Sequence, residues 1–398
     1  MVTQPNIIVV RFAELSTKGK NRKQFITMLR QNIQEVCKGF PSCKVQQAYD
    51  RIYVLVNDEN ASELMNRLQD VFGIATLSLA YQVPLAINDI IDAAFTLIQK
   101  EPVSTFKVIT RRMNKQFPLE SDEINRAVAK KILQETDFVV DVHKPQVKVL
   151  VEIRHHEAYV TVNTIEGAKG YPVKIQGKAM LLMSGGIDSC VASYLSNKRG
   201  IEVEAIHFAS PPYTSDAAKQ KVLDLAKVLT RYQPFIRLHI VPFTDIQMQI
   251  AMNVPESYRI TVMRRFMVRL AQRLAEQRRC KALITGESVG QVASQTLESM
   301  SVINEVTTMP ILRPLVSFDK TEIIEIAKKI GTYDISIRPF EDCCTIFTPV
   351  APVTKPLLHK AQRFESKLDI ETLIEESLAA TEVVMIRYND AKEEDSFF

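Results

Sequence analysis

The sequence predicts a multidomain protein in which α+β segments precede an α/β segment with a mostly parallel sheet. A chain of 398 residues is long for one domain, so two or three domains are expected. Between Lys178 and about Ile330, short apolar runs alternate with helical patterns, which is typical of parallel strands joined by helices. The residues before about 165 instead mix strand and helix signals in the manner of an α+β fold.

Composition narrows the class of protein. The chain is 46% apolar and 24% charged, as globular proteins are, and no apolar run approaches the length that crosses a bilayer. The first residues lack a basic stretch ahead of their apolar run, so we expect a strand there and no signal peptide. Six cysteines in so long a chain do not make a disulfide framework. We therefore expect free thiols and a cytoplasmic location.

The first 60 residues are expected to form a small α+β domain. Asn6–Phe12 and Arg51–Val56 have the apolar character of strands, and apolar residues between positions 25 and 36 recur at helical spacing. The loop ahead of that helix is basic and contains a glycine, so it is either a solvated helix start or a surface that contacts phosphate. Its candidate contact residues are Lys18, Lys20 and Arg22.

Residues 61–165 are expected to form a second α+β domain. A basic cluster of Arg111, Arg112 and Lys115 follows one of its strands. Basic residues at a strand exit can contact phosphates without reading sequence, although a solvated loop is the commoner explanation. The predicted helices are Ala61–Asp70, Ile87–Gln99 and Ser121–Gln134, and the predicted strands are 74–83 and 105–110, with β-rich runs near 139–154 and 159–163.

A glycine-rich segment at Ile165–Val173 has the composition of a linker. We therefore place the domain boundaries at 1–60, 61–165 and 166–398.

The most informative string is Ser-Gly-Gly-Ile-Asp-Ser at residues 184–189, directly after the apolar run Ala179–Met183. The run is typical of a buried strand, and residues 189–195 continue as a helix. Free N–H groups and the dipole at a helix N-terminus favour an anion such as phosphate, and glycines let a ligand approach the backbone. The loop residues expected to contact phosphate are Ser184, Gly185, Gly186 and Ser189.

Two further strand ends point to the same cleft. The strand Ala282–Thr285 runs into a Gly-Glu-Ser-Val-Gly-Gln string that begins at Gly286, and the strand Val203–Phe208 ends in serine and prolines. Open parallel sheets place their ligands at the carboxyl ends of the strands. Three such ends with small or turn residues predict one nucleotide cleft.

Asp188 needs an explanation, because a carboxylate in a phosphate loop repels its ligand. It either binds a magnesium ion or orients donors in the transition state, or it caps the helix that follows. These roles are compatible. The residues of a metal site remain unassigned.

Adjacent cysteines in a loop, Cys343 and Cys344, form the second unusual feature. The phosphate loop resembles that of the PP-loop ATP pyrophosphatases, a class that activates an oxygen by adenylation, and a thiol paired with such a loop suggests that sulfur displaces AMP. That chemistry needs a lowered thiol pKa, which the preceding acids would oppose, so we expect a compensating cation. Arg338 and the arginines near position 264 are candidates; most other arginines of that helix are expected to form a solvated face.

The chain is similar to the tRNA 4-thiouridine synthetases (tRNA sulfurtransferases, the ThiI family) over essentially its whole length. The phosphate loop alone resembles that of the PP-loop ATP pyrophosphatases in general. The Thr-Gly-Glu-Ser-x-Gly-Gln-Val-Ala-Ser-Gln-Thr run at 285–296 and the Glu-Asp-Cys-Cys-Thr-Ile-Phe segment at 341–347 are specific to the family. The resemblance implies a ferredoxin-like domain, a THUMP RNA-binding domain and a PP-loop domain, in that order.

The resemblance also implies site residues. The catalytic cysteine corresponds to Cys343, with Asp188 in the phosphate loop, and Cys344 or Cys190 is the candidate for a second thiol. The basic residues singled out in the first two domains would contact tRNA. The nucleotide contacts correspond to Leu182, Met183, His207, Phe208, Arg264, Gly286 and Gln295.

The implied reaction uses ATP and Mg²⁺ to convert the uridine at position 8 of tRNA into 4-thiouridine, and the family also supplies sulfur for the thiazole of thiamine. Some members carry a rhodanese domain, for which this chain leaves no room, so we expect sulfur from a cysteine desulfurase. A sulfur-carrier protein of thiamine synthesis is a further implied partner, and a homodimer is left open. Two alternatives remain: an amidating PP-loop ligase and a non-catalytic, ATP-responsive tRNA-binding protein.

Overall fold

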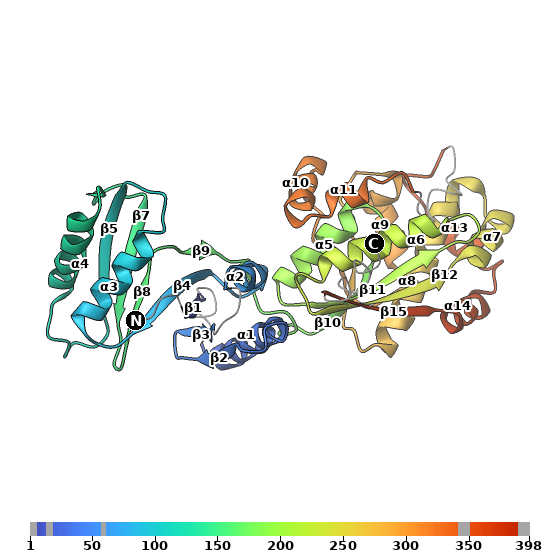
Figure 1. Ribbon diagram of the computed structural model, residues 1–398. Coiled ribbons are helices and arrows are strands. Elements are labelled where there is room, and N and C mark those ends of the chain that lie inside the picture. Colours follow the sequence, from blue (N-terminus) through green and yellow to red (C-terminus); the bar gives the residue numbers. More distant parts are fainter. Residues whose placement is uncertain (1–5, 13–18, 57–60, 341–350, 389–398) are drawn as a thin grey trace, which may run out of the picture. The chain divides into compact units, whose positions relative to one another are not determined.

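The computed structural model describes residues 6–12, 19–56, 61–340 and 351–388. The chain divides into two compact units, Met1–Tyr171 and Pro172–Phe398 (Figure 1). Lys18, Cys343 and Cys344 lie outside the described residues. In the part of the chain that the model covers, no helix is long and apolar enough to cross a membrane.

The N-terminal unit is built on one continuous sheet. Its strand order is β2-β3-β1-β4-β8-β7-β5-β6, with β9 paired to β4 beside this path. The long strand β4 joins the two halves, because Ala80 pairs with Ile7 of β1 on one side and with Thr161 of β8 on the other. The strands are β1 (Ile7–Arg11), β2 (Lys44–Gln47), β3 (Arg51–Leu55), β4 (Thr76–Val83), β5 (Thr105–Arg112), β6 (Val139–Val140), β7 (Val147–Ile153), β8 (Ala158–Thr161) and β9 (Ile165–Glu166).

Four amphipathic helices supply the apolar cover of this unit. In α1, Phe25, Leu29 and Ile33 recur at helical spacing and are buried, as the sequence predicts. The helix α4 begins with a capping box between Glu120 and Glu123, which satisfies backbone donors of its first turn. The helices are α1 (Arg22–Cys37), α2 (Ala61–Gln69), α3 (Ile87–Ile98) and α4 (Ser121–Glu135).

An ion cluster ties the two halves of this sheet together. Glu152 of β7 accepts hydrogen bonds from Arg11 at the end of β1 and from Arg51 at the start of β3. Arg154 lies 3.6 Å from the same carboxylate. Burial alone would raise the pKa of Glu152, but the three guanidinium groups outweigh it and hold the pKa below its ordinary value. The carboxylate therefore stays ionised and links strands that are distant in the sheet.

The segment with linker composition begins inside the sheet. Ile165 and Glu166 form β9 against β4, and the N–H of Gly167 donates to the carbonyl oxygen of Ala75 at 2.9 Å. A Cβ at position 167 would lie 2.6 Å from the carbonyl oxygen of Ile74, so only glycine fits. The two compact units separate after Tyr171. The three domain ranges given above stay a prediction.

The C-terminal unit has the predicted, mostly parallel sheet. Its strand order is β14-β13-β10-β11-β12-β15, and every neighbouring pair is parallel except β12 and β15. Successive side chains of β10 point to opposite faces, and Ala179, Met180 and Leu181 are all buried, so both faces are covered. The strands are β10 (Lys178–Leu182), β11 (Glu202–Ala209), β12 (Phe235–Pro242), β13 (Leu283–Ile284), β14 (Ile311–Leu312) and β15 (Glu382–Arg387).

Two groups of helices accompany this sheet (Figure 1). In the first group α5 packs against α6 and α10, and α11 packs against α6 and α10. In the second group α8 is central and packs against the others. The first group is α5 (Ile187–Lys198), α6 (Asp216–Leu229), α10 (Lys320–Ile330) and α11 (Tyr333–Ser336). The second is α7 (Thr244–Asn253), α8 (Arg259–Gln277), α9 (Leu297–Asn304), α13 (Leu358–Glu365) and α14 (Ile370–Ala379).

Two arginines of α8, Arg265 and Arg269, do not lie on the solvated face that the sequence suggested, whereas Arg273 is exposed as expected. Arg265 is only 1% exposed, and its guanidinium donates to the carboxylate of Glu365 in α13 at 2.8 and 2.9 Å. Arg269 donates to the same carboxylate. Acceptors a hundred residues away explain the error, because local apolar spacing carries no information about them. This buried cluster fastens α13 to α8.

Removing the carboxylate at position 365 should destabilise the C-terminal unit strongly. The Glu365→Ala variant removes the carboxylate shared by Arg265 and Arg269 and leaves the buried Arg265 with only its 2.9 Å pair to the partly exposed Glu305, so we expect the free energy of unfolding to fall by about 3 kcal/mol. The matched control is Glu371→Ala, which removes the partner of the exposed Arg273 and should cost less than about 1 kcal/mol. Urea unfolding measures both, and equal losses would contradict a dominant role for the buried cluster.

Candidate nucleotide site at the carboxyl ends of the strands

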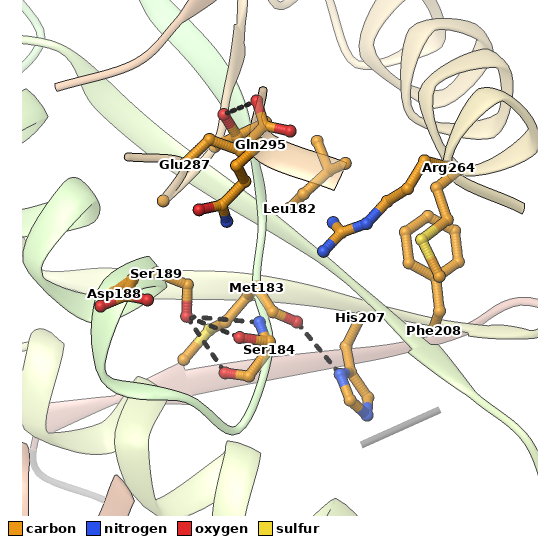
Figure 2. Close-up of a pocket in the computed structure, with 13 residues that line it drawn as sticks. Leu182, Met183, Ser184, Asp188, Ser189, His207, Phe208, Arg264, Glu287 and Gln295 are labelled. Atoms are coloured by element: carbon orange, nitrogen blue, oxygen red, sulfur yellow. Dashed lines mark hydrogen bonds between the residues drawn. The ribbon is translucent and has the colours of Figure 1, made fainter. Parts of the chain in front are cut away.

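The loop between β10 and α5 closes on itself at the start of the helix. The N–H of Ser184 donates to Oγ of Ser189 at 3.3 Å, and that hydroxyl donates back to the carbonyl oxygen of Ser184 at 3.1 Å (Figure 2). Gly186 is the N-cap residue of α5, and its N–H donates to Oγ of Ser184 at 3.2 Å. The turn therefore presents the N-terminus of α5, with its unpaired N–H groups, to the pocket beside it.

That pocket has a volume of about 210 Å³ and lies where three parallel strands end. Arg264 extends into it from α8, opposite the loop (Figure 2). The lining residues are Leu182, Met183, Ser184, Asp188, Ser189, His207, Phe208, Arg264, Met267, Thr285, Gly286, Glu287 and Gln295.

The structure brings the candidate nucleotide contacts together. All of those named from the sequence line the pocket except Gly185 and Gly186, which form the turn beside it. Sequence reasoning missed Met267, Thr285 and Glu287. Helical spacing places Met267 one turn after Arg264 on α8, and Thr285 and Glu287 flank Gly286. All three could therefore have been predicted from residues already assigned to the site.

The second glycine loop packs directly onto the first. A Cβ at position 286 would lie 2.7 Å from the carbonyl carbon of Asp188 and 2.8 Å from the backbone nitrogen of Ser189. No larger residue fits without moving one of the two backbones. On the other side of the loop, Nδ1 of the buried His207 lies 3.1 Å from the carbonyl oxygen of Met183. A backbone contact at Gly286 and a side-chain contact at His207 thus join the three strand ends around the pocket.

Asp188 is held by two side chains from distant parts of the chain. Nζ of Lys320, the first residue of α10, lies 2.6 Å from one carboxylate oxygen, and Nε2 of Gln291 lies 2.9 Å from the other. Gly186 is the N-cap of α5, so the suggested capping role of Asp188 is wrong. Lys320 lies 132 residues from Asp188 and was missed, because no sequence motif connects the two.

The second carboxylate in the pocket is also neutralised. Oε2 of Glu287 accepts hydrogen bonds from Oγ1 of Thr285 at 2.9 Å and from Nε of Arg313 at 2.8 Å. Lys320 thus pairs with Asp188 and Arg313 pairs with Glu287, so the charges of both carboxylates in the lining are offset, and Arg264 adds a guanidinium to the lining. Offset carboxylates reduce the repulsion of a polyanionic ligand.

Among the described residues, no cluster of three His, Cys, Asp or Glu side chains could hold a metal ion. A Mg²⁺ ion usually binds through one or two carboxylates together with substrate phosphates and water. Asp188 fits that pattern as a single protein ligand beside a polyphosphate.

Cys190 is an unfavourable second thiol. It is fully buried in the first turns of α5, and its sulfur lies 3.9 Å from the carbonyl oxygen of Gly186. A thiol that resolves a disulfide must be reachable by its partner, and burial opposes this.

The basic residues singled out in the N-terminal unit have different surroundings. Lys20, Arg111 and Lys115 are exposed. Arg22 lies over the ring of Tyr49, 4.2 Å from its centroid, and donates to its carbonyl oxygen. The side chain of Arg112 is only 6% exposed, because it holds the loop after β5 through the carbonyl oxygen of Leu119 and the carboxylate of Glu120.

These residues also do not form one cluster. The helix that follows Lys20 packs against β2 and α2, whereas Arg111 and Lys115 lie at the end of β5, four strands from β1 in the sheet order.

This fold and site define a nucleotide-binding protein of the PP-loop class: a mostly parallel sheet, a Ser-Gly-Gly-x-Asp-Ser turn at a helix N-terminus, and a pocket at the strand ends that an arginine enters. Family models agree with that class. A model of the ThiI ferredoxin-like domain matches residues 7–78, a THUMP model matches 86–163, and a model of the thiamine biosynthesis protein ThiI matches 174–370. The predicted order of ferredoxin-like, THUMP and PP-loop domains is confirmed.

Solved structures identify the family. The chain is 36% identical to the protein in a crystal structure of a 4-thiouridine synthetase–RNA complex with bound ATP, with 96% of this chain and 100% of that chain covered and a TM-score of 0.91. It also matches PH1313 from Pyrococcus horikoshii at 24% identity, with 82% and 99% of the chains covered and a TM-score of 0.64, which shows the fold alone. The chain belongs to the ThiI family of 4-thiouridine synthetases.

The contact between the two glycine loops should be sensitive to a single methyl group. We expect Gly286→Ala to lower the free energy of unfolding of the C-terminal unit by about 1–3 kcal/mol and to weaken ATP binding, because the phosphate loop must shift. The control is Gly186→Ala, whose Cβ would meet only Oγ of Ser184, at 3.3 Å. Urea unfolding compares both variants, calorimetric ATP titration compares Gly286→Ala with the wild type, and a Gly286→Ala protein as stable as the control would show that the contact is not restrictive.

Proposed function

We propose that this protein catalyses ATP-dependent sulfur transfer to tRNA and converts the uridine at position 8 into 4-thiouridine. The observation that carries the proposal is the pocket: a family-specific string, the phosphate loop and an arginine from α8 converge on it, in a chain similar over 96% of its length to a synthetase solved with RNA and ATP. Lys320 and Arg313 offset the two carboxylates of the lining, which would otherwise repel the ligand.

In the first step the pocket would hold ATP so that its α-phosphate meets the uracil O4. The N–H groups at the start of α5 and the guanidinium of Arg264 would bind the phosphate oxygens. Lys320, already at the rim beside Asp188, would neutralise charge that develops as pyrophosphate leaves. Asp188 is the residue that would hold a Mg²⁺ ion, which would supply charge stabilisation on the phosphates. The uracil O4 then carries AMP.

In the second step a persulfide on Cys343 would attack C4 of the activated uracil. AMP leaves with the former O4, and a disulfide joins Cys343 to the new C4 sulfur. Attack by a second thiol on Cys343 would release 4-thiouridine and leave a protein disulfide, which a cellular thiol reductant must reduce. Cys344 could close that disulfide only under strain, because adjacent Cα atoms are about 3.8 Å apart and disulfides need about 4.4 Å or more.

The remaining assignments follow from this chemistry. A cysteine desulfurase would load the persulfide, and tRNA would bind through the N-terminal unit, with Lys20, Arg111 and Lys115 as exposed phosphate contacts and Lys18 as a further candidate. We leave Arg22 and Arg112 out of the proposed contacts, because their guanidinium groups hydrogen-bond to carbonyl oxygens of the protein itself. Sulfur supply to thiamine synthesis and a cytoplasmic location belong to the same proposal.

Two other classes give different products. An amidating PP-loop ligase would use ammonia or glutamine and would not need Cys343. A non-catalytic binding protein would change its tRNA affinity with ATP and release neither AMP nor pyrophosphate. The pairing of Lys320 with Asp188 at the phosphate loop favours catalysis, because a passive switch does not need this poised charge.

The cysteine assignment is tested by sulfur-35 transfer from cysteine to unmodified tRNA, with a desulfurase, ATP and Mg²⁺. We expect Cys343→Ala to lose all label in tRNA yet keep ATP and tRNA binding. The control is Cys280→Ala, because burial raises the pKa of the Cys280 thiol to about 12 and makes it inert. Full labelling of tRNA by Cys343→Ala would show that another residue carries the sulfur. AMP release by the wild type without sulfur-35 in tRNA would favour the amidating ligase.

The phosphate-loop carboxylate is tested by the rate of pyrophosphate release. We expect Asp188→Ala to slow tRNA-dependent release roughly 100-fold or more, because Lys320 loses the group that holds it at the rim. The control is Asp216→Ala, which removes the acidic residue from the first turn of the neighbouring helix α6. An unchanged rate in Asp188→Ala would remove this residue from the mechanism.

A further inference from the structure

The helix α6 buries a lysine that the chemistry above does not use. Lys221 is 5% exposed, whereas the other two lysines of this helix, Lys219 and Lys227, are partly exposed. Lysine is almost never buried without a partner, because its ammonium loses hydration that only well-placed acceptors replace. A buried lysine at this place therefore needs an explanation from its contacts.

Two backbone carbonyl groups of one short stretch contact Lys221. Its Nζ donates to the carbonyl oxygen of Arg338 at 3.0 Å and approaches that of Phe340 at 3.5 Å. One turn later on the same helix, the carboxylate of Asp224 pairs with the guanidinium of Arg338. The helix thus holds residues 338–340 by backbone and side chain together.

That stretch leads directly into the segment with the proposed sulfur carrier. Cys343 follows Phe340 by three residues, and three extended residues span at most roughly 11 Å. Phe340 is therefore the point at which the chain enters the segment that carries Cys343. The pair with Asp224 also occupies Arg338, one of the cations expected from the sequence to serve the thiol.

We propose that Lys221 is a positioning residue for sulfur transfer: its buried ammonium fixes the carbonyl groups of Arg338 and Phe340, and so fixes the point from which the chain enters the Cys343 segment. This inference rests on the proposed function, because it assumes that Cys343 delivers the sulfur. Under this proposal two parts of the C-terminal unit have different roles. The pocket residues bind ATP and activate the uracil, whereas α6 holds the residues from which the chain enters the Cys343 segment.

The test compares two products of one reaction. Unmodified tRNA is incubated with ATP, Mg²⁺, cysteine and a desulfurase, and both AMP and 4-thiouridine are measured. In Lys221→Met we expect the kcat for 4-thiouridine to fall roughly tenfold or more, since misplacement by about 1 Å can cost up to 100-fold. The KM values for ATP and tRNA should not change. Adenylated tRNA that receives no sulfur hydrolyses, so the ratio of AMP to 4-thiouridine should rise by the same factor.

That ratio distinguishes positioning from loss of structure. A partly unfolded protein would lose both products together and leave their ratio unchanged. Lys221→Arg keeps the charge and the donors and should restore a ratio close to that of the wild type. The matched control is Lys219→Met on the same helix, whose lysine pairs with Glu382 of β15 and should leave the ratio unchanged. If Lys221→Met does not fold, Lys221→Gln decides in its place, with a raised ratio expected.

The outcomes separate this inference from the function on which it rests. If the wild type forms no 4-thiouridine, the proposed function fails. If the wild type thiolates tRNA and the folded Lys221→Met or Lys221→Gln variant does so with an unchanged ratio, the role of Lys221 is overturned. A raised ratio that Lys221→Arg corrects supports it.

Discussion

The close packing of Gly286 on the first turn of α5 is the constraint on which the site depends. It joins two loops a hundred residues apart, and no side chain fits between them. Lys320 and Gln291 then hold Asp188 from both sides of its carboxylate, so the start of α10 joins the same point. The contact at Gly286 thereby fixes the phosphate loop against the wall of the pocket. Because Lys320 pairs with Asp188 in that loop, its ammonium is positioned at the same point.

Pairing with basic side chains also offsets the charge of buried carboxylates elsewhere in the C-terminal unit. Glu204 at the start of β11 is buried and accepts hydrogen bonds from Lys178, His239 and Arg278; burial alone would raise its pKa, but these partners hold it at about 2. Glu365 serves two arginines of α8 in the same manner. Among the described residues of this unit, the buried carboxylates are therefore offset by their own basic partners. The proposed phosphate chemistry benefits, because these carboxylates add little repulsion to the pocket.

Much of this could be predicted because the informative signals are local. The turn at 184–189 and the string after Gly286 carry their chemistry in consecutive residues, and β10 shows its burial as a run of apolar side chains. Lys320, Lys221 and the partners of Arg265 could not be predicted, because each depends on an acceptor about a hundred residues away. The role of Arg112 could not be predicted either. A basic cluster in the sequence does not show which of its guanidinium groups hydrogen-bonds to a loop of the protein itself.

The central claim is that the pocket activates the uracil oxygen itself. The most direct measurement is to prepare tRNA with oxygen-18 at O4 of the target uridine, allow one round of thiolation with unlabelled ATP, and analyse the AMP by mass spectrometry. The account predicts one oxygen-18 atom in the AMP for each 4-thiouridine formed, because the oxygen leaves with the phosphate. AMP without the label, alongside thiolated tRNA, would show that ATP activates another group and would contradict the account.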